Sequence, residues 1–181
     1  AYNPSTLVNP ADGDGGYDVN APNQTREFSG AQTDGFGGGV FANNSGGDYM
    51  QLIANLGGGG TFGNMTAWSA ADFLPNTGGE LESFQIDYRP RDNGDTATVH
   101  FLLETSLGWY QTDQTDTSSV NTFGSWDASA ASLTWSPFSE FGVSGGTPAL
   151  ADLSDVVSVG FYTTTVSPAG VFAGSFVRGF S

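Results

Sequence analysis

Alternation of apolar and polar residues over positions 80–104 constrains the fold of this chain more than any other feature. Every second residue is apolar in 84–88 and again in 97–103. Successive side chains of a β-strand point to opposite faces, so this period of two predicts two half-buried strands. Residues 89–95 between them contain a proline and an Asn-Gly step, which are typical of a chain reversal. The pattern therefore predicts a β-hairpin whose core face consists of Phe84, Ile86, Tyr88, Val99, Phe101 and Leu103.

Short β-branched and aromatic runs, separated by turn residues, continue along the rest of the chain. Residues 156–165 predict another strand, whereas residues 48–56 fit a strand at least as well as a helix. The 27 Gly and 8 Pro spread between such runs favour a many-turned β-protein. We predict one all-β domain over residues 1–181, a two-sheet antiparallel β-sandwich of jelly-roll type. Residues 1–25 are interpreted as an extended N-terminal arm or a strand that enters the sandwich.

Charge and composition exclude several partners. The 19 acidic residues outnumber the four basic ones, all of them Arg, which leaves a net charge of −15. This charge would repel nucleic acids and anionic membrane surfaces, and no apolar run is long enough for membrane insertion. The absence of cysteine rules out disulfides and thiolate metal sites. Because the chain begins at Ala1 instead of Met, we expect a mature protein, secreted or at the cell surface after signal-peptide removal.

The acidic residues include a candidate calcium site near the N-terminus. Asp12, Asp14 and Asp18 are separated by two and four residues, among glycines that let the backbone fold around an ion. Carboxylate oxygens are ligands that calcium prefers, although no Glu stands at the twelfth position that an EF-hand requires. Two interpretations stay open here, a structural calcium ion and a simple Asp/Gly turn.

Few residues of this sequence are candidates for catalysis. The single histidine, His100, lies on the polar side of its predicted strand, whereas a catalytic zinc site usually takes two or three histidines. Glu80 and Glu82 share a strand face but do not match the acidic motif of jelly-roll glucanases. A polysaccharide lyase of sandwich fold would need a Tyr/His pair with Arg and Gln, for which the candidates are Gln85, Arg89, Arg91, His100 and Tyr162. We expect a protein that is not an enzyme, and a lyase or hydrolase is the third hypothesis.

Carbohydrate binding has more support from the residues. Sugars present C–H faces to aromatic rings and hydroxyls to polar side chains, so a site needs exposed aromatics beside polar groups. Trp109 with Tyr110 and Trp126 with Asp127 offer this combination. For both tryptophans a place in the core is an equal alternative. Further candidate ligand-binding residues lie on the outward face of the predicted hairpin: Gln85, Asp87, Arg89 and His100.

Four segments carry a resemblance to a known family. They read LESFQIDYR (81–89), VHFLLE (99–104), DLSDVVSVGFY (152–162) and VFAGSFVRGF (171–180). In this order they resemble the later strands of bacterial jelly-roll carbohydrate-binding modules and of the related lectin-like domains of exported PEP-CTERM-type proteins. Such relatives often hold a structural calcium ion through an Asp of the last strand. Gly174, Ser175 and Phe176 occupy that place here, which leaves the three N-terminal aspartates as the calcium ligands.

The first hypothesis is therefore an exported, non-catalytic, lectin-like β-sandwich that binds a polysaccharide or glycan. The second is a self-assembling subunit of an extracellular filament or surface layer. In that case the N-terminal arm, with Leu7 and Val8 as apolar anchors, would add as a strand to the sheet edge of a neighbouring copy.

Overall fold

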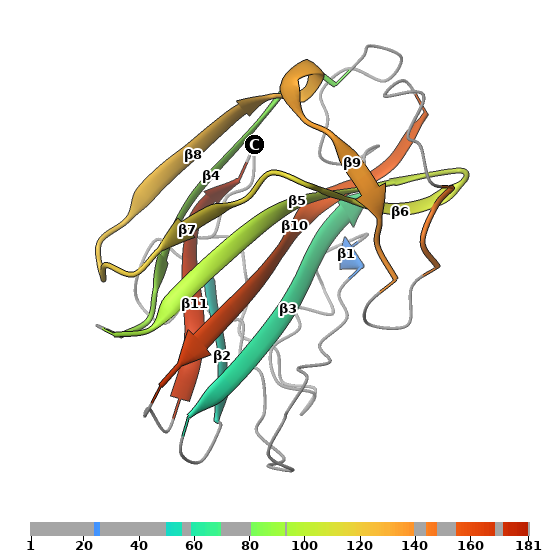
Figure 1. The fold of residues 1–181 in the computed structure, drawn as a ribbon. Helices are drawn as coiled ribbons and strands as arrows, with labels where there is room; N and C mark the ends of the chain where they lie inside the picture. Colours follow the sequence, from blue (N-terminus) through green and yellow to red (C-terminus); the bar gives the residue numbers. More distant parts are fainter. Residues whose placement is uncertain are drawn as a thin grey trace.

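The computed structural model of the protein describes residues 24–25, 50–55, 59–69, 81–92, 94–139, 144–147, 155–168 and 172–180. These residues form eleven strands and one short 3-10 helix, η2 (Ala130–Ser132) (Figure 1). The strands are β1 (Gln24–Thr25), β2 (Met50–Asn55), β3 (Gly60–Ser69), β4 (Ser83–Pro90), β5 (Thr96–Thr105), β6 (Gly108–Thr112), β7 (Asp116–Ser118), β8 (Gly124–Ser129), β9 (Trp135–Pro137), β10 (Val156–Ser167) and β11 (Phe172–Phe180). The segment 48–56, which fitted either element, thus contains a strand.

The strands form two antiparallel sheets that lie face to face (Figure 1). Sheet A has the order β1-β3-β10-β5-β6-β9, with β7 paired to β5, and sheet B has the order β2-β11-β4-β8. One apolar cluster contains buried residues of both sheets and fills the space between them. The described residues therefore form an all-β, two-sheet antiparallel β-sandwich, as predicted. The jelly-roll subtype stays a prediction.

The predicted hairpin over residues 80–104 is wrong. Strand β4 pairs with β11 and β8 in sheet B, whereas β5 pairs with β10, β6 and β7 in sheet A. The turn between them carries the chain from one sheet to the other, and it is closed by a hydrogen bond from the Asp95 N–H to the Asp92 carbonyl. Alternation within a strand shows that one face is apolar, but two such faces can meet across a core as readily as side by side in one sheet.

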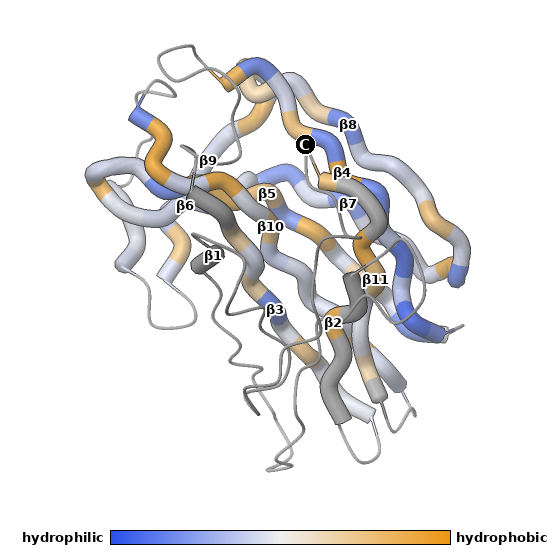
Figure 2. The backbone as a smooth tube through the Cα atoms, turned by 180° about the vertical axis from the view of Figure 1, so that it is seen from behind, coloured by the Kyte–Doolittle hydropathy of each residue, from blue (hydrophilic) through white to orange (hydrophobic). Residues whose placement is uncertain are grey.

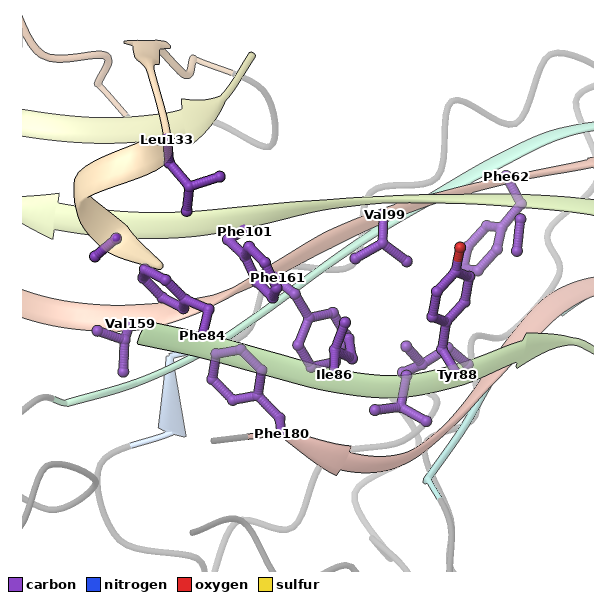
Figure 3. Packing of buried hydrophobic residues seen from close by; sticks show 14 of the residues in the cluster. Phe62, Phe84, Ile86, Tyr88, Val99, Phe101, Leu133, Val159, Phe161 and Phe180 are labelled. Atoms are coloured by element: carbon purple, nitrogen blue, oxygen red, sulfur yellow. The ribbon is translucent and has the colours of Figure 1, made fainter. Parts of the chain in front are cut away.

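The residues predicted for the core face of this segment are nevertheless buried, because β4 and β5 pack against each other through these faces (Figure 3). The rings of Phe84 and Phe101 stack across the two sheets at 4.7 Å between centroids. The ring of Trp126 stacks on Phe101 at 4.1 Å, and Phe180 adds an edge contact to Phe161. Such pairs contribute about 0.5–1.5 kcal/mol each beyond the burial of their area.

A second, smaller cluster covers the outer face of sheet A. It contains Met65, Ala67, Leu102, Trp109 and Phe138, with the half-buried Tyr162 packed against it. Backbone hydrogen bonds from Trp109 N–H to Ser144 O, and from Gly146 N–H to Trp109 O, fasten residues 144–147 beside it. One part of the outer face of sheet A is therefore a second core, while the outer face of sheet B carries polar residues.

Candidate functional site

The outer face of sheet B gathers four of the residues predicted to bind a ligand. On β4, the inward positions of Phe84, Ile86 and Tyr88 leave Gln85, Asp87 and Arg89 to point outward. On β8, Asp127 lies directly opposite Gln85 in the strand register, and Ser125 lies opposite Asp87. Figure 2 shows how hydrophilic residues recur along these two strands. We name this surface the sheet B face, consisting of Gln85, Asp87, Arg89, Phe123, Ser125, Asp127 and Phe176.

Arg89 occupies one end of the sheet B face between two aromatic rings. Its guanidinium carbon lies 4.3 Å from the ring centroid of Phe176 and 5.1 Å from that of Phe123. Phe176 of β11 is the register partner of Arg89, and Phe123 directly precedes β8. The guanidinium also donates hydrogen bonds to the carbonyls of Pro90 and Arg91, both at 3.3 Å. These contacts hold the planar cation in one orientation on the surface.

The middle of the face offers hydrogen-bonding groups of several kinds. Ser125 Oγ donates a hydrogen bond to Asp87 Oδ1, which orients that carboxylate. Gln85 and Asp127 are exposed, so their amide and carboxylate are open to solvent. An amide, two carboxylates, a hydroxyl and a guanidinium together present both donors and acceptors to a ligand along one strand pair.

His100 does not belong to this surface. It lies on the outer face of sheet A, so the prediction that it shares one outward face with Gln85, Asp87 and Arg89 is wrong, because the hairpin on which that prediction rested does not form. Its Nδ1 lies 2.8 Å from the Thr112 carbonyl. A carbonyl only accepts, so Nδ1 carries a proton and donates this hydrogen bond. The imidazole stacks on Tyr162 at 5.7 Å between centroids.

The three aromatic candidates are packed into the protein. Trp109 is 5% exposed within the second core, and Tyr110 is fully buried with its hydroxyl accepting a hydrogen bond from the Thr147 N–H at 3.0 Å. Trp126 points inward onto Phe101, while its neighbour Asp127 points outward. The prediction that these three residues are exposed rim aromatics is wrong, and for Trp109 and Trp126 the alternative of a place in the core holds. Phe138 and residues 144–147, which help cover the outer face of sheet A, are distant in sequence and gave no local signal.

The proposed lyase constellation is divided between the two sides of the sandwich. His100 and Tyr162 lie together on sheet A, whereas Gln85 and Arg89 lie on sheet B, with Arg91 in the turn and paired to Asp92 at 3.0 Å. Glu82 is exposed, and Glu80 lies outside the described residues. These residues therefore do not converge on one site.

The calcium ligands predicted at Asp12, Asp14 and Asp18 lie outside the described residues. Within the described part of the chain, no group of three or more His, Cys, Asp or Glu side chains is arranged to hold a metal ion. The same residues contain no helix long and apolar enough to cross a membrane.

Two side chains with shifted pKa values lie inside the sandwich. Burial, followed by the negative charge and the hydrogen bond of Asp116, holds the pKa of Tyr88 well above its usual range. Burial also raises the pKa of Asp95. Both residues occupy inward positions, so neither contributes to the sheet B face.

Phe123, Ser125 and Phe176 were not among the residues predicted from the sequence. Phe176 does carry a local signal, because it occupies the outward phase of β11 between the inward Ser175 and Val177. Phe176 is nevertheless only 8% exposed, because the Arg89 guanidinium lies over its ring, so the guanidinium and not the ring is the part of this pair that a ligand meets first. Phe123 and Ser125 follow a loop, and their proximity to β4 depends on the pairing of β8.

No protein-family model matches this sequence, and no curated protein matches it either. The sheet B face is therefore interpreted from its own chemistry.

Proposed function

We propose that this protein is a non-catalytic carbohydrate-binding β-sandwich whose ligand lies along the sheet B face. The observation that carries the proposal is the placement of Arg89 between Phe123 and Phe176, next to the polar row of Gln85, Asp87 and Asp127. A sugar hydroxyl both donates and accepts, and this row contains a carboxylate acceptor, an amide with both functions and a guanidinium donor.

The shape of this surface favours an extended polymer over a small molecule. Strands β4 and β8 are paired over six residue pairs, from Ser83 opposite Ser129 to Tyr88 opposite Gly124. Outward side chains recur every two residues along such a pair, at about 6.6 Å. A ligand that lies along the pair would therefore meet several successive rows of the face, as an extended glycan chain can. Hydrolysis is less favoured, because Asp127 is exposed and lacks the apolar surroundings of a general acid.

A binding experiment with variants on both sides of the sandwich tests the proposal. The wild-type protein is screened on an array of neutral and acidic polysaccharides, and the best ligand is titrated by calorimetry. We expect the double variant Gln85→Ala/Asp127→Ala to lose at least about tenfold in affinity, since two hydrogen-bonding residues are removed. His100→Ala changes the opposite face and should bind like the wild type. Loss of binding in the His100 variant alone, or no binding to any glycan, would contradict the proposal.

We also propose the jelly-roll topology for the sandwich. Strands β2, β4 and β11 lie in sheet B, while β3, β5 and β10 lie in sheet A, so the chain crosses repeatedly between the sheets. The last two long strands return to inner positions, with β10 between β3 and β5 and β11 between β2 and β4. In a Greek key a later strand comes back to pair beside an earlier one, and a jelly roll consists of two Greek keys. An experimental structure with a different strand order would overturn this assignment.

Self-assembly is a second candidate function, favoured by the position of β8. This six-residue strand ends sheet B, and no described strand pairs with its outer edge. Such an edge can accept a strand from another copy. The N-terminal arm predicted to supply it lies outside the described residues, apart from the pairing of Gln24 and Thr25 with β3. Light scattering of the full chain and of a chain lacking residues 1–20 tests this function. Self-assembly predicts that the full chain associates as its concentration rises and that the truncated chain does not.

Export, bound calcium and the family resemblance stay predictions.

A further inference from the structure

One end of the sandwich interior contains three inward-facing polar residues. Thr165 and Ser167 of β10 are each 1% exposed, and Asp95, just before β5, is 3% exposed. In the strand register Thr165 lies opposite Ala97 and Val166 opposite Thr96, which brings Ser167 level with Asp95 on the same inward face. The side chains of Ser167 and Asp95 are hydrogen-bonded to each other. The three residues therefore form one buried polar group beneath the turn that joins β4 to β5.

Two oxygens of this group have no hydrogen-bond partner among the residues that the structure describes. They are Oδ2 of Asp95 and Oγ1 of Thr165. A buried polar atom without a partner costs about 1–3 kcal/mol, and a charged one costs more. Two such oxygens on diagonally adjacent positions of paired strands therefore indicate a missing partner that both could share.

The donor set limits what this partner can be. A carboxylate and hydroxyls are all oxygen donors, which is the set that hard cations take. The group contains only one buried carboxylate, which explains why it is not one of the clusters of three acidic or histidine side chains considered above.

We propose that Asp95 and Thr165 bind a hard metal cation, Ca²⁺ or Na⁺, at the end of the sandwich where β4 crosses to β5. Ser167 positions the Asp95 carboxylate through their hydrogen bond. The cation neutralises the buried carboxylate and ties the crossing turn to the end of β10. This site is separate from the three N-terminal aspartates and from the sheet B face, and it does not depend on the proposed function.

Thermal unfolding of the metal-free protein tests this site. The full chain is treated with EDTA and melted in tetramethylammonium chloride, and then in CaCl₂ or NaCl at the same ionic strength. We expect one of the two cations to raise Tm by about 5 °C or more at a concentration about 100 times its Kd. The two salts distinguish a calcium site from a sodium site. If neither raises Tm more than tetramethylammonium does, the proposal is wrong and the two oxygens bind water.

Variants separate this site from cation binding elsewhere on the acidic chain. Asp95→Asn keeps the shape and removes the charge, so the rise in Tm should disappear. Thr165→Val removes only the hydroxyl, so its Tm in tetramethylammonium should equal or exceed that of the wild type, while its response to the cation falls by half or more. Asp113→Asn, at an exposed position, is the charge-matched control and should respond like the wild type. If Asp95→Asn fails to fold, the Tm of Thr165→Val is the test. A folded variant of either kind whose Tm rises with the cation as much as that of the wild type would overturn the proposal.

Discussion

The hydroxyl of Tyr88 donates a hydrogen bond to Oδ2 of Asp116 over 3.0 Å. Tyr88 belongs to β4 of sheet B, and Asp116 begins β7, which pairs with β5 of sheet A. The bond therefore joins the two layers of the sandwich. Figure 3 shows Tyr88 among the core residues between the sheets. Apolar contacts between the layers tolerate small shifts, whereas a hydrogen bond requires a defined distance and direction. This contact thus helps to specify how the short strand β7 sits against sheet B.

Replacing Tyr88 by Phe should lower the free energy of unfolding by about 1–3 kcal/mol at pH 7, because the Asp116 carboxylate loses its partner inside the protein. Urea unfolding followed by tryptophan fluorescence measures the change. Asp116→Asn retains an acceptor oxygen and should cost less than Tyr88→Phe. Equal stability of the wild type and Tyr88→Phe would show that the bond makes no net contribution.

The stability of the wild type should fall as the pH rises above about 10. In the unfolded chain Tyr88 ionises at its ordinary pKa of 10.0, whereas burial and Asp116 raise its pKa in the folded protein. The unfolded state therefore binds fewer protons than the folded state in this range, and each released proton costs about 1.4 kcal/mol per pH unit. Tyr88→Phe lacks this titration, so its stability should decline less between pH 9.5 and 11. Parallel curves for the two proteins in urea unfolding at these pH values would contradict the assignment.

Phe101→Ala should destabilise the protein by about 3–5 kcal/mol, as is typical for an emptied core position. Its ring is fully buried and stacks on both Phe84 and Trp126. Phe101→Leu keeps most of the volume and should cost clearly less. Calorimetric or urea unfolding of both variants provides the measurement. A loss below about 1 kcal/mol for Phe101→Ala would mean that the two sheets do not meet at this ring.

Two glycines form a matched pair that tests the backbone packing. A Cβ on Gly160 of β10 would lie 2.1 Å from the Thr66 carbonyl oxygen of β3, whereas a Cβ on Gly124 of β8 would meet no atom within 4 Å. Because a backbone oxygen cannot move aside, Gly160→Ala should destabilise by about 3 kcal/mol or more. Gly124→Ala should stay within about 1 kcal/mol of the wild type. Unfolding curves that coincide for the two variants would contradict the close pairing of β10 with β3.

The exposed positions of the sheet B face were largely predictable. Gln85, Asp87 and Arg89 lie outward because their neighbours along β4 are apolar, and this alternation is visible in the sequence. Phe123 and Ser125 could not be placed beside them, because the pairing of β8 with β4 joins segments nearly forty residues apart. The burial of Trp109 and Tyr110 was hidden for the same reason, since Phe138 and residues 144–147 contact them only in the folded chain.

By itself the sequence determined which residues form the main strands around positions 84–103 and which of their side chains face the core. Side-chain direction in a strand follows from the local backbone geometry, so each strand carries this information within itself. Only the tertiary structure decided that β4 and β5 belong to opposite sheets, which separates His100 from Arg89 and encloses Asp95. Strand pairing is a long-range choice between equally apolar faces, and it is settled by how the whole core packs, as in the stacking of Phe84 on Phe101 across the two sheets.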